Sequence, residues 1–296
     1  MKTTFIKSGN LQLFATYNQT NKEEKRECVL FLHGFPDDHR SWEYQLEHFK
    51  DSYNVCAIDL RGISRSTAPS ASDAYGIDDI MPDITAACKF LADDEQVHLV
   101  GHDWGAILAF QYISNPALSK RVKSYTAVSC PHVAIAFDNV RENLFNADLG
   151  QWATLSQQFL KSWYIMLFQL PFLPEFVIDN FAATGWQYAM QAGEIPATDP
   201  MHNYATQEIV DIMRNGVNLY RQLLRRGIPP LPPHIDLPVS IVIAERDLAI
   251  KPEAYDNHEQ FFTHLHKYSM NTNHWAHREN PIEVNQIIEN QIKSAA

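Results

Sequence analysis

A single five-residue stretch, Gly-His-Asp-Trp-Gly at 101–105, constrains the fold of this chain more than any other feature. The apolar run 97–100 before it has the composition of a buried strand, and the run 106–110 after it has that of a helix. A strand passes straight into a helix only through a sharp, strained turn, where small neighbours let other backbone approach. We therefore predict a strand–turn–helix unit with Asp103 at its tip.

A carboxylate at the tip of such a turn carries distinctive chemistry. The order of small residue, any residue, nucleophile, any residue and small residue describes a nucleophile elbow, in which serine is the usual nucleophile. An aspartate there attacks a carbon atom directly and leaves an alkyl-enzyme ester. Asp103 therefore indicates the opening of epoxides or the displacement of halide rather than ester cleavage. The competing interpretation is that Asp103 only caps the following helix.

The rest of the chain alternates predicted strands and helices on either side of a central interruption. We expect strands at 3–7, 11–17, 28–32, 54–58, 97–100, 122–128, 239–244 and 265–270, and helices at 42–49, 77–92, 104–115, 252–262 and 281–292. Such alternation indicates an α/β fold with a mostly parallel eight-stranded sheet and helices on both of its faces.

The interruption predicts a second, helical domain. Between residues 133 and 230 the sequence shows no strand pattern, and it ends in the stiff, proline-rich stretch 229–233. We expect a helical cap at 133–230, inserted into a core formed by 1–132 and 231–296, over the carboxyl ends of the strands where ligands bind. The aromatic residues of the cap favour an apolar substrate; they include Phe137, Trp152, Phe159, Trp163, Phe168, Phe172, Phe176 and Trp186.

The loop after the strand predicted at 28–32 carries a signal of catalysis. Its sequence is His-Gly-Phe-Pro at 33–36. A glycine-containing loop there can present the backbone N–H of Phe35 to an oxyanion, with the N–H of Trp104 as the second donor. We expect His33 in the same loop to be structural.

A carboxylate and a histidine follow the last two predicted strands. Asp247 comes after the strand at 239–244 and can orient a histidine, with Glu245 as its rival. His274 comes after the final strand and can act as a general base. For His277, the rival base, we expect a surface or capping role at the start of the last helix.

Together these motifs resemble the α/β-hydrolase superfamily and, within it, the epoxide hydrolases. The chain order of nucleophile, acid and histidine is that of the α/β-hydrolases. The sequences at 33–36 and 101–105 and the closing stretches 274–275 and 279–285 are similar to those of epoxide hydrolases. The resemblance covers nearly the whole chain and implies the α/β-hydrolase fold.

Two cap segments extend the resemblance. Residues 162–171 and 218–221 are similar to the two cap segments of epoxide hydrolases and place Tyr164 and Tyr220 at the acid positions of that family. Two phenols aimed at an epoxide oxygen can donate hydrogen bonds or a proton as it leaves. The alternative for either tyrosine is packing within the cap. We expect the substrate pocket to be lined by Phe35, Trp104, Trp163 and Phe168.

The predicted activity is therefore the conversion of a small apolar epoxide to a vicinal diol. Asp103 attacks the epoxide, Tyr164 and Tyr220 hold its oxygen, and His274, oriented by Asp247, activates the water that hydrolyses the ester. The resemblance implies neither a cofactor nor a metal.

Two other functions share part of the pattern. A haloalkane dehalogenase uses the same nucleophile followed by a tryptophan, here Trp104, but it needs a second halide donor, and Phe35 stands where many of them have asparagine. Three cap tryptophans could take that place: Trp152, Trp163 and Trp186. A non-catalytic ligand-binding domain is the second alternative, although such domains usually lose part of the nucleophile, acid and base set.

Composition narrows the possible partners. The net charge of -11, from 35 acidic and 24 basic residues, disfavours nucleic acid and anionic membrane surfaces. The chain has no apolar run of about 18 residues and no signal-peptide core, so we expect a cytoplasmic protein without stable membrane insertion. Monomer and homodimer both remain open. The four scattered cysteines are expected to be buried free thiols, namely Cys28, Cys56, Cys88 and Cys130.

Overall fold

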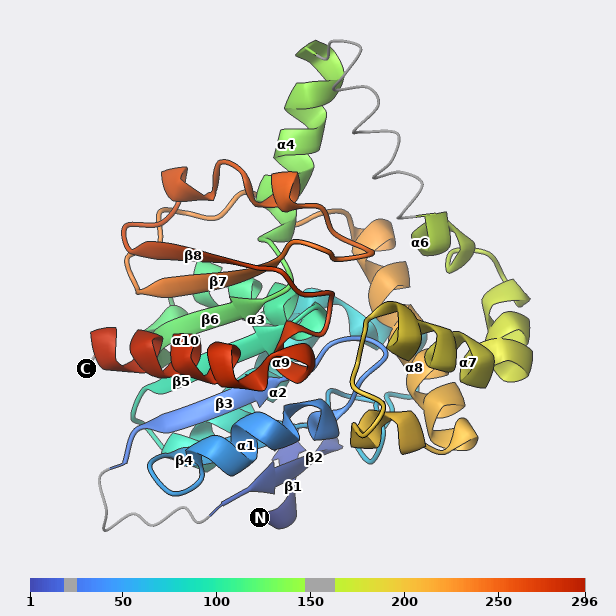
Figure 1. The fold of residues 1–296 in the computed structure, drawn as a ribbon, viewed down its shortest axis with the longest axis horizontal. Helices are drawn as coiled ribbons and strands as arrows, with labels where there is room; N and C mark the ends of the chain where they lie inside the picture. The colour runs from blue at the N-terminus through green and yellow to red at the C-terminus, as the bar shows by residue number, and fades with distance from the viewer. Residues whose placement is uncertain (19–25, 147–162, 296) are drawn as a thin grey trace.

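The computed structural model describes residues 1–18, 26–146 and 163–295, and these are built around one β-sheet (Figure 1). Within them the strands are β1 Lys2–Ser8, β2 Leu11–Tyr17, β3 Cys28–Leu32, β4 Asn54–Ile58, β5 Val97–His102, β6 Val122–Val128, β7 Val239–Ala244 and β8 Leu265–Met270. They lie in the order β1-β2-β4-β3-β5-β6-β7-β8, with β1 and β2 antiparallel to their neighbours and the others parallel. The predicted mostly parallel, eight-stranded α/β sheet is confirmed.

Helices of the core cover both faces of this sheet. They are α1 Glu43–Phe49, α2 Ile77–Ala92, α3 Trp104–Ser114, α9 Ala276–Glu279 and α10 Pro281–Ser294, with the 3-10 turns η1 His39–Trp42, η2 Ser72–Tyr75, η3 Ser119–Arg121, η5 Pro252–Tyr255 and η6 His258–Gln260. Alternate residues of β3 show why two layers form. Leu30 and Leu32 pack in the apolar cluster that contains α2 and α3, whereas Val29 and Phe31 pack in the cluster that contains α1 and α10.

The predicted helix at 252–262 is wrong. The chain there forms only η5 and η6, which are separated at Asn257, whose backbone lies in the left-handed region at φ 62°. A left-handed residue cannot continue a right-handed helix. The other predicted strands and helices agree with the observed ones to within two residues at each end.

Further helices lie between β6 and β7, in the segment that the sequence assigns to the cap. Those described are α4 Val133–Asn146, α6 Trp163–Leu167, α7 Leu173–Ala192 and α8 Thr206–Arg226, with the 3-10 turn η4 Pro200–Asn203. In Figure 1, α6, α7 and α8 stand to the right of the sheet. A Cβ atom on Gly216 of α8 would lie 2.5 Å from the ring of Phe35, so α8 rests directly on the loop after β3.

A buried ion pair ties this helical segment to the core. Arg278 of α9 is 1% exposed and donates hydrogen bonds to both carboxylate oxygens of Asp199, which precedes η4. It also donates to Glu43 of α1. Breaking a buried pair by removing one partner typically destabilises a protein by about 3–5 kcal/mol. Arg278 therefore anchors the helices above the sheet to the core beneath them.

The helices of the described residues include none that is long and apolar enough to cross a membrane. All four cysteines are free and buried, as the sequence predicts. Burial raises the pKa of the Cys56 and Cys88 thiols, so both remain protonated and unreactive at neutral pH.

Candidate active site

The turn between β5 and α3 has the strained geometry that the sequence predicts. Asp103 has φ 48° and ψ -116°, a conformation that residues other than glycine rarely adopt. The turn is so tight that a Cβ atom on Gly105 would lie 2.1 Å from the carbonyl oxygen of Leu32 on the neighbouring strand. Glycine is therefore required at 105, and the elbow presents Asp103 at the end of the central strand.

The two carboxylate oxygens of Asp103 have different surroundings. Oδ1 accepts a 2.8 Å hydrogen bond from the backbone N–H of Phe35, so the side chain is drawn to this loop instead of capping α3. Oδ2 lies 3.6 Å from Nε2 of His274. Trp104 is the first residue of α3, where a backbone N–H has no carbonyl partner within the helix. A second donor thus lies next to the carboxylate.

His274 is held by a buried carboxylate. Its Nδ1–H donates a 2.8 Å hydrogen bond to Oδ2 of Asp247. The other oxygen of Asp247 accepts from the backbone N–H groups of Ala249, at 2.7 Å, and Ile250, at 3.1 Å. Asp247 is 3% exposed, whereas its rival Glu245 is on the surface. The geometry therefore favours Asp247 as the residue that orients the histidine.

The charges around His274 set its protonation. Burial alone would lower the pKa of His274, but the carboxylates of Asp247, Asp103 and Asp37 raise it to about 9. Burial likewise opposes ionisation of Asp247, but His274 and two backbone N–H groups hold the pKa of that carboxyl below its usual value. At neutral pH the His274 imidazole is therefore protonated, and it lies between the carboxylates of Asp247 and Asp103.

Two tyrosines share a cavity with Asp103. Tyr164 on α6 and Tyr220 on α8 both line it, with ring centroids 5.8 Å apart. Tyr220 also packs edge-to-face against Trp104, at 5.0 Å between centroids. Burial raises the pKa of both phenols, and the negative charge of Asp103 adds to the shift. Both tyrosines therefore keep their protons and can donate hydrogen bonds into the cavity.

Comparison with known proteins identifies the family of this chain. A family described as the alpha/beta hydrolase fold matches residues 27–281. The chain belongs to the α/β-hydrolase family. Among solved structures, an epoxide hydrolase of Bacillus megaterium in complex with an inhibitor superposes with a TM-score of 0.78, covering 98% of this chain and 100% of the other at 23% identity. A structure titled as novel epoxide hydrolases from metagenomes of hot environments has a TM-score of 0.78, with 24% identity over 99% and 98% of the two chains. At these identities the likeness shows the fold.

Curated relatives of this α/β hydrolase match most of its length. Epoxide hydrolase 3 of Mus musculus is 28% identical over 272 residues, which are 88% of this chain and 69% of the relative. A protein of Mycobacterium tuberculosis named "Probable oxidoreductase EphD" is 24% identical over 274 residues. That match covers 90% of this chain but 45% of the relative, so the chain spans about half the length of that protein.

The cavity of this α/β hydrolase is largely apolar. Its volume is about 720 Å³. Besides Asp103, Trp104 and the two tyrosines, its walls include Ile107, Val133, Ala134, Phe137, Leu223 and Ile250. Phe35 and Phe168, which we expected in the lining, pack behind Tyr220 with ring centroids 5.3 and 5.2 Å from it. Neither is among the residues that line the cavity, so their predicted place in the lining is wrong.

The predicted place of Trp163 in the pocket is wrong. Its side chain is 62% exposed, whereas the next residue, Tyr164, lines the cavity. Successive residues of a helix point about 100° apart, and α6 is turned so that Tyr164 and Ile165 line the cavity while Trp163 lies on its outer side. The remaining cap aromatics lie elsewhere: Phe172 and Phe176 are exposed, Trp186 is buried against Trp275, and Trp152 and Phe159 lie outside the described residues.

Sequence reasoning missed one wall of the cavity. Cys130 follows β6 and lines the cavity together with Asp103, and Ala249 and Ile250 contribute from the loop after β7. Burial raises the pKa of the Cys130 thiol far above its ordinary value, and the charges of Asp103 and Asp247 add to the effect. The thiol is therefore a neutral wall residue. Its position just after a strand of the sheet is the signal that could have identified it.

The other histidines near the site are buried and structural. His33 accepts a 3.0 Å hydrogen bond at Nε2 from the backbone N–H of Leu60, in keeping with the structural role predicted for it. The surface role predicted for His277 is wrong. Its ring is fully buried between Trp42 and His102, with centroids 4.4 and 4.5 Å away, because α9 packs against the core. Burial holds the pKa of His277 well below its usual value.

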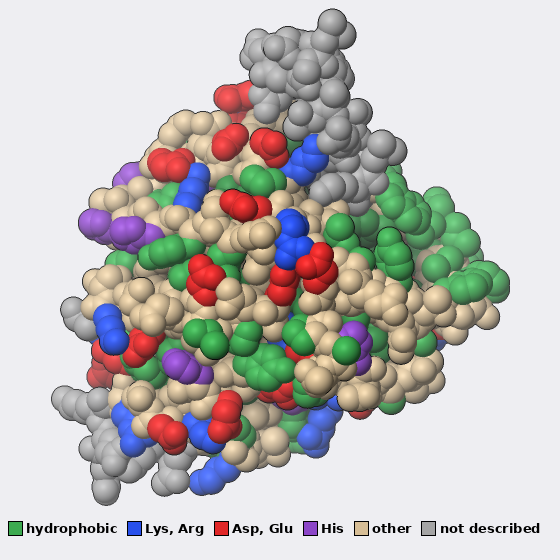
Figure 2. Space-filling view, viewed as in Figure 1, with side chains coloured by type: hydrophobic (Ala, Val, Ile, Leu, Met, Phe, Trp, Pro, Cys, Tyr) green, Lys and Arg blue, Asp and Glu red, His purple; other side chains and the backbone are tan. Residues whose placement is uncertain are grey.

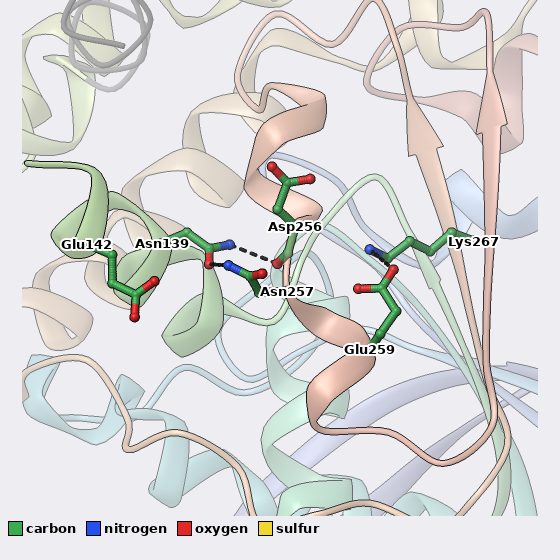
Figure 3. Close-up of a pocket in the computed structure, with 6 residues that line it drawn as sticks. All are labelled: Asn139, Glu142, Asp256, Asn257, Glu259 and Lys267. Carbon is green, nitrogen blue, oxygen red and sulfur yellow. Dashed lines mark hydrogen bonds and ion pairs between the residues drawn. The ribbon is translucent and has the colours of Figure 1, made fainter. Parts of the chain in front are cut away.

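A second hollow, of about 290 Å³, lies beside α4 and is strongly polar (Figure 3). Asn139 donates to the backbone oxygen of Asp256 at 2.8 Å and accepts from Asn257 at 2.7 Å, and Lys267 pairs with Glu259 at 2.6 Å. Its side chains thus bind mainly one another. The hollow contains none of the predicted site residues, so the apolar cavity is the candidate active site.

Proposed function

We propose that this α/β hydrolase converts an apolar epoxide to a vicinal diol through a covalent ester on Asp103, using only its own side chains. The observation that carries the proposal is the presence of a carboxylate nucleophile and two protonated phenols in one apolar cavity. The names of curated relatives, such as epoxide hydrolase 3 of Mus musculus, support the same activity.

The first step opens the epoxide ring. Oδ2 is the carboxylate oxygen not held by Phe35, so it forms the new bond to an epoxide carbon. The carbon–oxygen bond of the ring breaks, and its electron pair goes to the leaving oxygen. Tyr164 or Tyr220 donates a proton to that oxygen, a contribution that typically accelerates such a step about 10²–10⁴-fold.

Ester formation also changes the state of His274. The charge of Asp103 is one of the causes that raise the pKa of this histidine, and the ester removes that charge. The pKa of His274 therefore falls after the first step, and the imidazole releases its proton to solvent and becomes a general base; it takes a proton back from solvent when the charge of Asp103 returns at the end of the cycle. Ring opening thus prepares the base that the second step needs.

The second step hydrolyses the ester. His274 takes a proton from water, and the hydroxide adds to Cγ of Asp103. The resulting oxyanion on Oδ1 is stabilised by the N–H groups of Phe35 and Trp104, where one such donor is worth about 3 kcal/mol. Collapse breaks the Cγ–Oδ2 bond, and the diol leaves with Oδ2 and the proton from His274. The proton of the regenerated carboxyl group restores the tyrosine.

The two alternatives predicted from the sequence have less support. A dehalogenase needs a second halide donor, but Trp186 donates its indole N–H to the backbone oxygen of Met201 at 2.9 Å, and Trp163 is exposed. The third candidate, Trp152, lies outside the described residues. A non-catalytic binding domain would not need Asp103, Asp247 and His274 together, with His274 hydrogen-bonded to Asp247 and 3.6 Å from Asp103.

An isotope experiment tests the covalent route. A single turnover of styrene oxide in ¹⁸O-water, with enzyme in excess, should place the label on Asp103 and leave the first diol unlabelled, because the diol carries away Oδ2. Mass spectrometry of the active-site peptide and of the diol measures both. Label in the first diol would show that water attacks the epoxide directly and would refute the ester route. Release of bromide from a bromoalkane without diol formation would favour the dehalogenase.

A further inference from the structure

The helical segment carries a second apolar surface, on its outside. Side chains of α6 and the start of α7 are exposed there: Trp163 62%, Met166 65%, Leu170 46%, Phe172 86%, Leu173 42% and Phe176 61%. We call these six residues the cap patch. Figure 2 shows hydrophobic side chains gathered over α6 and α7. Large contiguous apolar patches on the surface of a protein mark interaction sites.

The cap patch is nearly free of charge. From 163 to 178 the only charged residue is Glu175, and it pairs with Arg221 at 2.7 Å. Phe172 adds a second observation. Its backbone lies in the left-handed region at φ 62°, which is costly for a bulky side chain, yet its ring is the most exposed of the patch. Backbone strain that holds a large ring in solvent points to a function for that ring.

We propose that the cap patch is the interface of a homodimer, in which two copies pack their patches together about a twofold axis. If a large apolar side chain offers roughly 150–250 Å² when fully exposed, the six residues leave on the order of 700 Å² uncovered. Two such patches bury about 1,400 Å², which is within the usual range of specific interfaces. A self-complementary apolar patch is what a twofold dimer requires.

A bilayer surface fits the cap patch less well. Helices that lie on membranes combine their apolar face with lysine and arginine that reach the headgroups. Here Arg221, which reaches Glu175 beside the patch, is bound in an ion pair, and the chain carries a net charge of -11. The cap patch of a second copy is apolar, so binding to it does not require positively charged side chains.

The proposed dimer has a consequence for the site. None of the five residues of α6 is fully buried, although the helix gives Tyr164 and Ile165 to the cavity and Trp163 and Met166 to the cap patch. A partner copy would cover the outer side of α6 and hold Tyr164 in place. This consequence rests on the proposed function, whereas the dimer itself does not.

Sedimentation velocity of the purified chain tests the dimer without reference to activity. We expect the wild type to run at twice its chain mass of 33.9 kDa. The variant Phe172→Asp/Phe176→Asp should run as a monomer. Ile282→Asp, which places the same charge on a residue of α10 that is 82% exposed, should remain a dimer. Met166→Lys provides a second patch variant, and circular dichroism checks that each variant is folded.

Three results would overturn the proposal. A wild type that is monomeric at every concentration excludes the dimer, and a dimer that survives both patch variants places the interface elsewhere. If the wild type is monomeric and floats with phosphatidylcholine vesicles while the patch variants do not, the occupant is a lipid surface. A wild type that forms the dimer but turns over no epoxide would contradict the proposed function and would still support the dimer.

Discussion

The core and the helical segment above it hold their functional side chains by different means. In the core, Asp103, Asp247 and His274 follow strand ends and are linked by hydrogen bonds of 2.8 Å to each other or to backbone. Above it, Tyr164 and Tyr220 are held by ring packing, with centroids 5.0–5.8 Å from their neighbours. In the proposed mechanism this difference has a counterpart: residues of the core make and break the ester, and the tyrosines assist the leaving oxygen. Substitutions in the core should then abolish one step of the reaction, whereas substitutions of the tyrosines should only slow ring opening.

The sharpest test of the core is His274→Gln. This change removes the base for ester hydrolysis but leaves Asp103 able to attack, so turnover should cease while the ester accumulates. The mass of the intact protein after incubation with an epoxide should rise by the mass of the substrate. The double variant Asp103→Asn/His274→Gln is the control and should form no adduct. A folded His274→Gln protein without adduct contradicts the role of Asp103 as nucleophile.

Asp247→Asn should slow turnover severely while alkylation of Asp103 continues. Loss of the orienting carboxylate from a comparable triad reduces turnover about 10⁴-fold. Steady-state kinetics on the variant measures the loss. Glu245→Gln, at the surface residue directly after β7, is the matched control and should be near wild type. If the two variants lose equal activity, Asp247 is not the orienting acid.

The tyrosines should show a graded loss. Tyr164→Phe and Tyr220→Phe keep the rings and their packing, so each should retain part of the opening rate, because the other phenol still donates. The double variant should lose about 10²–10⁴-fold. Stopped-flow fluorescence of Trp104, which packs against Tyr220, reports the opening step. Tyr188→Phe, at a position that is 71% exposed, is the control. An unchanged opening rate in the double variant means that the tyrosines only pack.

The smallest expected effect is on stability as a function of pH. The folded-state pKa of His274 is about 9, above its ordinary value of 6.5. Its stabilising contribution is therefore complete below pH 6.5 and is lost as the pH rises through 9, by about 3 kcal/mol at most. Denaturant unfolding at several pH values should show this decline in the wild type. His274→Gln should show a smaller decline, and equal declines in both proteins would exclude His274 as its source.

The features that could be predicted from the sequence differ between the core and the helical segment. The central strands were predictable because each is a short apolar run between turn residues, and Asp103 and Asp247 could be found because each follows such a run. His274 follows the more polar β8. The break in the helix at Asn257 could not be predicted, because a single left-handed residue does not change the pattern of apolar residues. Which side of a five-residue helix faces inward depends on tertiary packing, and for this reason Trp163 was misplaced.

The burial of individual side chains was also not predictable from the sequence. His277 stands at the start of a helix, where exposure is the ordinary expectation, yet packing of α9 on the core encloses it completely. Cys130 has no chemistry that a motif would record, and its position just after β6 was the one signal in the sequence that it belongs to the wall.

The composition of the cavity wall has a consequence for how such proteins diversify. Much of the wall comes from 133–141, 164–165 and 220–231, a stretch that contains no member of the triad. Apart from Tyr164 and Tyr220, residues there can mutate to reshape the cavity and change which molecules fit, while the strand ends that carry Asp103, Asp247 and His274 stay as they are. Selection can therefore act on substrate choice largely through one part of the gene and on reactivity through another.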